Sequence, residues 1–292
     1  MLLDFADEAC LDVSRAGGKG ASLARMSALG LPVPPGFVVS ADVLAAALPD
    51  AGDALRAALP DAGRAQAIVA EAEPPDEIGA RYEALGDDAP VAVRSSACAE
   101  DSEAASYAGQ QETYLHVRGR EDVRDRVRDC WASFFSERAI FYRSRKGSLD
   151  DLGMAVVVQR MVRADVAGVL FTCDPVHHRH DRMVVEAVLG LGEAAVSGAL
   201  TPDHYVLKRD GTLKRARVAP QPFALFPVEA GGVEERVLGD EGAAQKLDED
   251  RLRELARIGD DLERRLGGPQ DIEWAIEGGE LFVLQSRPVT AR

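Results

Sequence analysis

The sequence lacks the features of a membrane-spanning, secreted or zinc-binding protein. No window approaches the ~20 consecutive apolar residues that a membrane-spanning helix needs. The first residues, Met1 to Glu8, are acidic and have no basic stretch typical of a signal peptide. The four cysteines stand far apart and form no C-x-x-C pair, which argues against zinc spacing and against a small disulfide framework. We therefore expect a cytoplasmic protein with reduced thiols.

Positive charge is also scarce. The 292 residues include 49 Asp and Glu but only 34 Lys and Arg, for a net charge of −15. Phosphate-rich surfaces attract basic proteins, so this balance argues against a general binder of nucleic acid or of anionic membranes. A local basic pocket for a phosphorylated small molecule stays compatible with it. The hydrophobic share of 46% and the charged share of 28% are typical of a globular protein with a sizeable core.

Periodicity predicts a mixture of helices and strands. Helices and strands alternate without strict βαβ order, which favours an α+β architecture over a Rossmann domain. A glycine-rich turn at 17–20 is expected to open into a helix that stops at Gly30, and Ser40 is expected to cap a second helix. Further helices are expected at 121–145 and 247–266, with short ones within 49–90. Strands are expected at 37–39, 91–94, 113–117, 154–159, 168–172 and 183–188, with a hairpin joining 204–208 to 213–218.

The most informative stretch is 271–287, which alternates between polar and apolar residues on both sides of a glycine turn. A two-residue loop would put the apolar residues of its two strands on opposite faces. We therefore expect a three-residue loop, Gly278-Gly279-Glu280, with a left-handed glycine and a bulge. This register pairs Trp274 with Leu284, Ile276 with Phe282, Glu273 with Gln285, and Asp271 with Arg287.

The polar face of this predicted hairpin carries hard oxygen donors. Asp271, Glu273 and Gln285 together are suited to a magnesium ion that bridges phosphates. Arg287 beside them offers a planar fork for a phosphate. The alternative is an ordinary solvated face with one cross-strand ion pair.

Two further cations occupy suggestive positions in the first third of the chain. Lys19 lies within Gly17 to Gly20, where backbone N–H groups and a cation suit an anion, although the spacing is not that of a Walker A loop. Arg94 ends an apolar strand just before two serines and a long polar stretch, 95–111. The alternatives are a surface turn for Lys19 and a structural ion pair for Arg94.

Taken together, these segments resemble one family over nearly the whole chain. The matching blocks follow in order: 17–23, 33–37, 93–97, 99–101, 108–115, 168–172, 174–175, 190–193, 196–198, 201–203 and 285–288. They resemble the ATP-binding domain of the phosphoenolpyruvate synthase and pyruvate phosphate dikinase family, which rifampin phosphotransferase and glucan water dikinase share.

The resemblance implies an ATP-grasp fold, in which two α+β lobes, approximately 1–150 and 151–292, hold ATP and Mg²⁺ between them. It implies that Lys19, Arg94 and Arg287 contact the ATP phosphates and act in catalysis, with Arg94 stabilising charge on the transferred group. Gly109 and Thr113 would lie on a loop that covers the phosphates, and Gln159 would lie near the adenine. The ligands of the metal and the nucleotide would be Glu273 and Gln285, with Asp271 as a neighbour.

The phosphoryl acceptor is where the sequence departs from the family. None of the five histidines lies in the Gly-Gly-x-Thr-Ser-His setting of the family's carrier histidine. We expect a phosphotransferase that passes phosphoryl to a histidine on a partner domain or chain. The alternatives are a stand-alone kinase or ligase that acts on a small molecule, and a non-catalytic ATP-binding subunit.

Two smaller features stand outside this assignment. His177, His178 and His180 occupy a turn where the family more often has Thr-Gly; a metal cluster or a partner contact is conceivable, and a solvated turn is the simpler interpretation. Cys98 lies on the expected lid, but no paired base accompanies it, so a bland small-residue substitution is favoured over a nucleophilic role.

Overall fold

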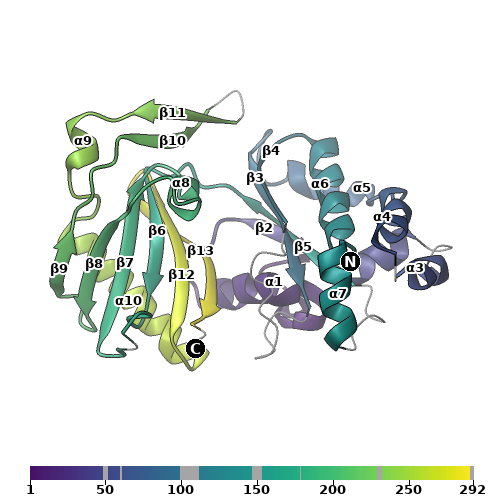
Figure 1. The fold of residues 1–292 in the computed structure, drawn as a ribbon, viewed down its shortest axis with the longest axis horizontal. Helices are drawn as coiled ribbons and strands as arrows, with labels where there is room; N and C mark the ends of the chain where they lie inside the picture. Colours follow the sequence, from purple (N-terminus) through teal and green to yellow (C-terminus); the bar gives the residue numbers. More distant parts are fainter. Residues whose placement is uncertain are drawn as a thin grey trace. The chain divides into compact units, whose positions relative to one another are not determined.

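The computed structural model describes residues 1–48, 52–59, 61–98, 112–146, 153–177, 179–228 and 232–289, which form two compact units (Figure 1). The first comprises Met1–Gly30 and Pro34–Met161, and the second comprises Leu31–Val33 and Val162–Arg292. Each unit combines helices with antiparallel sheet, which confirms the predicted α+β class. The first unit extends beyond the expected limit of residue 150, because strand β5 (Met154–Arg160) pairs with two of its strands.

The first unit is built on a five-stranded sheet in the order β1-β2-β5-β3-β4. One face of this sheet packs on an apolar core that includes Trp131 and Phe135, both fully buried. Helix α1 packs on the other face, where Gly20 contacts Val38. The remaining strands are β1 (Leu2–Asp4), β2 (Gly36–Val39), β3 (Val91–Ala97) and β4 (Thr113–Val117).

The helices of the first unit correct two expectations and agree with a third. The predicted helix 121–145 is two helices, because the side chain of Ser136 accepts a hydrogen bond from Ala139 N and starts a new helix. Ser40 does not cap the next helix, since its hydroxyl donates to Met1 O and Ala41 takes the capping position. Helix α1 is assigned from Val13, but Gly17, with φ +68° and ψ 174°, breaks it, so the helix that follows the glycine turn and stops near Gly30 is as expected. The helical elements are η1 (Glu8–Leu11), α1 (Val13–Ala28), α2 (Asp42–Ala47), α3 (Gly52–Ala58), α4 (Ala62–Ala70), α5 (Asp76–Glu83), α6 (Arg120–Ser133) and α7 (Glu137–Lys146).

The second unit contains a six-stranded sheet in the order β13-β12-β6-β7-β8-β9 and a separate β10–β11 ribbon. Helix α10 covers one sheet face, and Gly259 allows it to approach Leu170 closely. The hairpin around Gly211, whose φ is +81°, is confirmed, whereas the ribbon was not predicted because β11 is short and fully exposed. The strands are β6 (Val166–Phe171), β7 (Arg182–Leu189), β8 (Asp203–Lys208), β9 (Leu213–Arg217), β10 (Phe223–Pro227), β11 (Val233–Val237), β12 (Gln270–Glu277) and β13 (Glu280–Pro288), and the helices are α8 (Glu193–Val196), α9 (Asp240–Ala243) and α10 (Glu249–Leu266).

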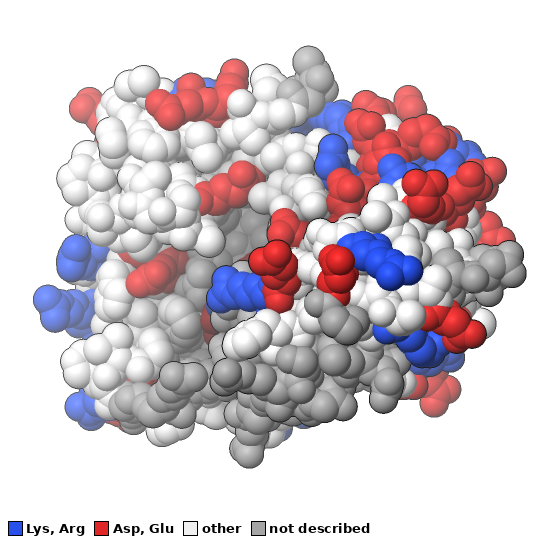
Figure 2. All heavy atoms as spheres, turned by 45° about the vertical axis from the view of Figure 1, so that its right-hand side comes forward, with Lys and Arg blue, Asp and Glu red and all other residues white. Residues whose placement is uncertain are grey.

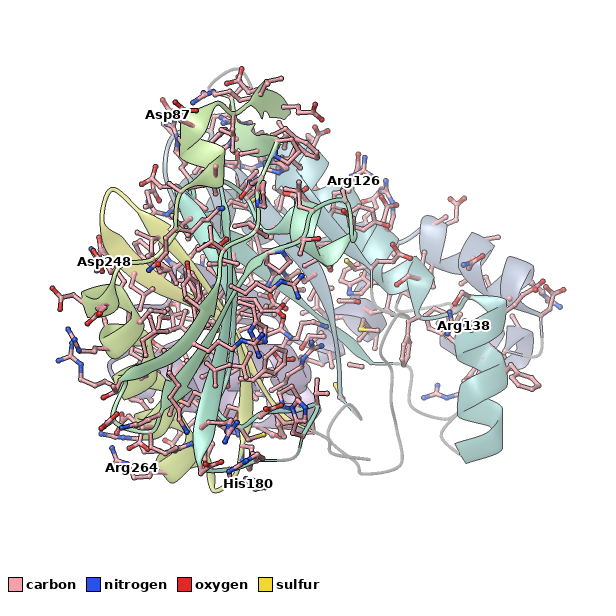
Figure 3. The ribbon with its side chains drawn as sticks, turned by 60° about the vertical axis from the view of Figure 1, so that its left-hand side comes forward. Asp87, Arg126, Arg138, His180, Asp248 and Arg264 are labelled. Carbon is pink, nitrogen blue, oxygen red and sulfur yellow. The ribbon has the colours of Figure 1, made fainter. Side chains whose placement is uncertain are left out.

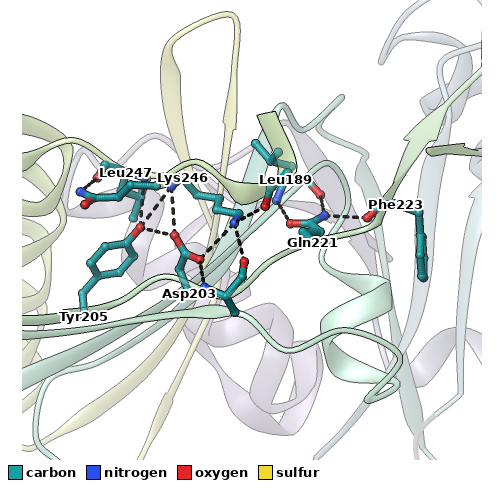
Figure 4. Close-up of polar contacts among 10 residues, drawn as sticks. Leu189, Asp203, Tyr205, Gln221, Phe223, Lys246 and Leu247 are labelled. Carbon is teal, nitrogen blue, oxygen red and sulfur yellow. Dashed lines mark hydrogen bonds and ion pairs between the residues drawn. The ribbon is translucent and has the colours of Figure 1, made fainter. Parts of the chain in front are cut away.

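A buried ion pair ties three segments of the second unit together. Asp203 Oδ2 accepts hydrogen bonds from Tyr205 OH at 2.6 Å and from Lys246 N at 3.0 Å, and its Oδ1 accepts one from Ala219 N at 2.9 Å (Figure 4). Lys246 Nζ lies 3.1 Å from Asp203 Oδ1 and also donates to Ala219 O and Gly242 O. Both charged side chains are at most 1% exposed, so each of their polar atoms is buried and satisfied.

The acidic composition appears on the surface as interleaved charge. Figure 2 shows acidic and basic side chains alternating over the helices of the first unit. On α6, Arg124, Arg126 and Arg128 pair with acidic residues three positions away. In the part of the chain that the structure describes, no helix is both long enough and apolar enough to cross a membrane.

Candidate functional site

The glycine-rich segment of α1 packs directly on β3 and is not a free surface turn. Lys19 Nζ donates to Ser95 O at 3.0 Å, and Gly20 N donates to Ser96 Oγ at 3.2 Å. Gly17 has a φ of +68°, and a Cβ there would lie 2.2 Å from Ser96 O. Only glycine permits both this backbone conformation and this approach. The glycines thus hold Lys19 beside the end of β3.

Strand pairing brings three of the predicted residues of the first unit into one neighbourhood. Arg94 is the cross-strand partner of Thr113, and Ser95, whose carbonyl holds Lys19, is its chain neighbour. Gln159 pairs with Ala92, two residues before Arg94, and therefore lies on the same sheet face. Gln159 is 3% exposed, and its Nε2 donates to Pro34 O at 3.4 Å.

Gly109 and the blocks 99–101 and 108–111 lie outside the described residues. Their predicted place on a phosphate-covering loop therefore stays a prediction. Ser95 and Ser96, expected in that loop, continue strand β3 instead, because they pair with Val156 and Ala155.

The register of the β12–β13 hairpin is partly confirmed and partly wrong. Glu277 pairs with Glu280, so the loop has two residues, Gly278 and Gly279, with φ values of +56° and +83°. Trp274 faces Val283 and Ile276 faces Leu281, which corrects the predicted partners Leu284 and Phe282. A register shift follows at Glu273/Trp274, and beyond it Glu273 faces Gln285 and Asp271 faces Arg287, as predicted.

The bulge explains how a short loop and the predicted polar pairs coexist. Leu284 is the extra residue on β13 between the partners of Trp274 and Glu273. Val283 and Leu281 consequently share the face of Trp274, which packs towards α10, while Phe282 lies opposite Ala275 on the other face. There Phe282 and Leu284 pack with an apolar cluster of Val162, Ala164, Ala167, Leu191, Leu225 and Ala275.

The sheet face opposite α10 therefore has a polar and an apolar part. We call it the open face. Its polar part contains Asp271, Glu273, Gln285 and Arg287. Its apolar part is the exposed edge of the buried cluster around Ala275, where Phe282 and Leu284 are half-buried. All of these residues belong to the second unit. Such a surface can hold a ligand that is charged at one end and apolar at the other.

Asp271 is the most constrained of these side chains. Its Oδ2 accepts a hydrogen bond from Arg287 Nε at 2.8 Å, while its Oδ1 is buried and has no hydrogen-bond partner. Burial raises the pKa of the Asp271 carboxyl above its usual range; Arg287 acts in the opposite direction and the charge of Glu273 in the same direction. A second cation would relieve this site, because it would neutralise two neighbouring carboxylates and occupy the free oxygen.

The histidine turn forms no metal cluster among the residues that the structure describes. Across those residues, no group of three or more His, Cys, Asp and Glu side chains is arranged to hold a metal ion. His177 Nδ1 lies 3.0 Å from Asp174 Oδ2, and His180 lies at the end of the sheet (Figure 3). His178 lies outside the described residues. The turn is thus organised by Asp174, whose Oδ1 accepts hydrogen bonds from the backbone N–H of Val176 and His177.

The four cysteines are all free thiols. Burial raises the pKa of the Cys10 thiol to about 12, so this residue stays protonated at neutral pH. Cys98 is partly exposed, and its Sγ lies 3.4 Å from Ser14 O.

Sequence reasoning missed one residue of the open face. Glu186 on β7 pairs with Val169 on β6, which in turn pairs with Glu273 on β12. Gln285, Glu273, Val169 and Glu186 therefore form one row across four strands. The signal in the sequence is the single carboxylate within the apolar run of β7, because Glu is rarely found in a buried strand.

Comparison with known proteins gives relatives for almost the whole chain. A protein named "Probable phosphoenolpyruvate synthase" from Methanocaldococcus jannaschii is 40% identical over 96% of this chain and 26% of its own length. Its counterpart from Methanothermobacter thermautotrophicus is also 40% identical, over 96% of this chain and 44% of its own length. Rifampicin phosphotransferase from Bacillus cereus is 35% identical over 99% of this chain and 36% of its own length. The chain thus spans less than half the length of these relatives.

Similarity to solved structures is distant. ACD1 from Ca. Korarchaeum cryptofilum, solved in complex with coenzyme A, matches with a TM-score of 0.38 and 12% identity over 92% of this chain and 90% of that chain. D-alanyl-alanine synthetase A from Vibrio cholerae matches with a TM-score of 0.36 and 11% identity over 95% of this chain and 59% of that chain. Scores of this size do not assign a function.

The family itself is clear from sequence. The family described as "Pyruvate phosphate dikinase, AMP/ATP-binding domain" matches residues 13–292. This match includes every residue that we predicted to bind ATP or metal. The chain belongs to the AMP/ATP-binding domain family of pyruvate phosphate dikinase.

Proposed function

We propose that this chain is a Mg–ATP-dependent phosphotransferase module that cleaves ATP and passes phosphoryl to a histidine on a partner domain or chain. The observation that carries the proposal is the polar part of the open face, where Asp271 and Glu273 lie beside Gln285 and Arg287 with one buried carboxylate oxygen unsatisfied. Membership of an AMP/ATP-binding family supports the choice of nucleotide.

In the second unit, the polar part would hold the metal and the phosphates. The donor set fits Mg²⁺, because Asp271, Glu273 and Gln285 supply the oxygen ligands that this ion prefers. A bound Mg²⁺ would neutralise charge on the phosphates, and Arg287 would bind a phosphate with its exposed guanidinium. The half-buried side chains Phe282 and Leu284, at the edge of the apolar cluster, support a place for the adenine.

In the first unit, Lys19, Arg94 and Thr113 form the second set of nucleotide contacts in this proposal, with Gly109 on the covering loop. Arg94 would stabilise the charge that develops on the transferred phosphoryl group, and Lys19 would bind the phosphates. Gln159 would border the adenine.

The third part of the proposal is the phosphoryl acceptor. The relatives are named phosphoenolpyruvate synthases and rifampicin phosphotransferases, and each is more than twice as long as the part that matches this chain. A histidine on a separate domain or chain would take the phosphoryl group. Direct transfer to a small molecule, by a kinase or a ligase, is the second candidate, and binding without turnover is the third.

The test is to incubate the protein with Mg–ATP, alone and with the histidine-bearing carrier domain of a relative such as rifampicin phosphotransferase. The nucleotides are separated by chromatography, and the label from [β-³²P]ATP and [γ-³²P]ATP is followed. AMP together with carrier label supports the proposal. ADP in the presence of a small acceptor and without the carrier favours the kinase, and unchanged ATP in every mixture contradicts enzyme function.

A further inference from the structure

The row that contains Glu273 extends beyond the residues that the family resemblance implies. Glu186 lies in this row, two strands from Glu273, with Val169 between them. Neighbouring strands lie about 4.8 Å apart, so the backbones of Glu186 and Glu273 are separated by about 10 Å. Residues paired across a sheet point to the same face. The two carboxylates therefore border a common strip of the open face, floored by the half-buried Val169.

Glu186 is an unusual carboxylate for its position. It is half-buried in the middle of a six-stranded sheet, next to fully buried Val185. Within the described chain, its side chain makes no hydrogen bond or ion pair, although His204 is its cross-strand partner on β8. By contrast, Asp203 in the same sheet satisfies both of its oxygens. A half-buried carboxylate without a partner costs stability unless a ligand completes it.

The position of Glu186 along the strands identifies the ligand group that it would meet. Asp271 and its partner Arg287 lie two residues further along the strands from the row of Glu273, next to Phe171, where the metal would bind. Ala167 and Ala275 lie one step the other way, in the apolar cluster. Glu186 thus stands level with the boundary between the parts that would hold the phosphates and the base. In a nucleotide, the group between these two is the sugar.

We propose that the Glu186 carboxylate accepts hydrogen bonds from the ribose hydroxyls of the bound nucleotide and makes the site selective for ribonucleotides over deoxyribonucleotides. This inference rests on the proposed ATP site. Glu186 is a specificity-determining residue here and takes no part in phosphoryl transfer. A carboxylate suits this role, because its two oxygens can accept hydrogen bonds from two adjacent hydroxyls and, when ionised, it is an acceptor only.

The test measures equilibrium dissociation constants by calorimetry for ATP, 2′-deoxy-ATP and 3′-deoxy-ATP with Mg²⁺ and without an acceptor. The wild-type protein is expected to bind at least one deoxy analogue about tenfold or more weakly than ATP, the usual effect of one hydrogen bond to a charged group. In Glu186→Ala this preference is expected to disappear, because ATP binding weakens while binding of that analogue stays unchanged. Glu186→Gln should restore part of the preference. Glu241→Gln, an exposed carboxylate on α9, is the matched control and should behave like wild type.

The outcomes distinguish failure of the proposed ATP site from failure of the proposed role of Glu186. If wild-type protein binds no ATP, the proposed function and this inference both fail. If ATP binds but Glu186→Ala weakens ATP and both analogues equally, Glu186 is structural and the inference alone is overturned. His204→Ala tests whether Glu186 and His204 form a structural pair. If His204→Ala and Glu186→Ala each weaken the binding of all three nucleotides equally, Glu186 acts through His204 and the inference is overturned. A changed Mg²⁺ requirement with an unchanged ribose preference would assign Glu186 to the metal and overturn it as well.

Discussion

Two aspartates of the second unit show how the same residue type serves stability in one place and a ligand in another. Asp203 and Asp271 are both paired with a cation and both shielded from solvent. Every polar atom of the Asp203–Lys246 pair has a partner inside the protein, whereas Asp271 leaves one buried oxygen unsatisfied. Their cations differ too, since Lys246 is 1% exposed and Arg287 is 58% exposed.

The difference teaches that completeness of hydrogen bonding, rather than burial or charge alone, separates the two roles. A satisfied buried network rigidifies the fold, and removal of one member leaves the others without partners. In an incomplete network, a ligand can bind the buried polar atom that has no hydrogen-bond partner. The Thr201-Pro202-Asp203 block of the family resemblance therefore has a structural explanation in Asp203, while the 285–288 block adjoins the proposed ligand.

The largest effect is expected from the satisfied pair. Asp203→Ala should reduce the free energy of unfolding by about 3–5 kcal/mol, because it leaves the buried ammonium of Lys246 without its counter-charge. Urea denaturation followed by circular dichroism measures this change. The double variant Asp203→Leu with Lys246→Met should recover most of the loss. A loss of stability below about 1 kcal/mol in Asp203→Ala would contradict a special structural role for this buried pair, because exposed ion pairs contribute up to that much.

The next effect concerns turnover and not stability. Arg94→Ala and Glu273→Ala should each reduce ATP cleavage by about 10²–10³-fold, because each removes a group that meets charge on the phosphates or the metal. Thermal unfolding should stay near that of wild type. Arg126→Ala, on the exposed surface of α6, serves as the control for a lost arginine. Wild-type turnover in both site variants would contradict the assignment of the site.

Ligand-dependent stability gives a third and smaller effect. Mg–ATP at about 100 times its dissociation constant should raise the free energy of unfolding by about 2.7 kcal/mol. Removal of Mg²⁺ with EDTA, or the Glu273→Ala substitution, should abolish most of this gain. Differential scanning fluorimetry with and without the nucleotide measures it. An equal gain for ATP with and without the metal would argue against a magnesium site on β12–β13.

Asp271→Ala provides the direct counterpart of Asp203→Ala. We expect the free energy of unfolding to change by less than about 1 kcal/mol, because Arg287 is exposed and regains water when its partner is lost. Burial raises the pKa of the Asp271 carboxyl, so removal of this buried charge offsets part of the lost stability. Affinity for Mg–ATP should nevertheless fall. A destabilisation as large as that of Asp203→Ala would place both aspartates in the same structural class.

The smallest effect is expected in the histidine turn. The pKa of Asp174 lies below its usual range: burial alone would raise it, and hydrogen bonds from His177 and from Val176 N outweigh that effect. The stabilisation is therefore present above the ordinary Asp pKa near 3.9 and is lost as the pH falls through the lowered value. His177→Ala should cost less than about 1 kcal/mol at pH 7, since His177 is 72% exposed. Unfolding curves between pH 7 and 3 should show the two proteins converging at acidic pH, and a loss of ATP turnover in the variant would instead assign the turn to the active site.

Much of the fold and part of the candidate site could be predicted from local patterns. Strict alternation over 271–287 correctly predicted the polar pairs Asp271–Arg287 and Glu273–Gln285. The hairpin loop was predicted wrongly, because a bulge at Leu284 changes the register between the turn and these pairs, and alternation alone cannot locate it. The long helix at 121–145 was wrong for a similar reason, since the capping contact of Ser136 interrupts a continuous apolar stripe.

By itself, the sequence determined the family, the α+β class and the chemical types of the site residues. These depend on side-chain identity and on periods of two and 3.6 residues, which are properties of the chain alone. Only the tertiary structure decided that Gly17 brings Lys19 onto β3, that Phe282 and Leu284 share the face of Asp271, and that Glu186 stands in the row of Glu273. Such neighbourhoods are set by strand order, bulges and close backbone approach, which join residues far apart in the chain and leave no periodic signal within it.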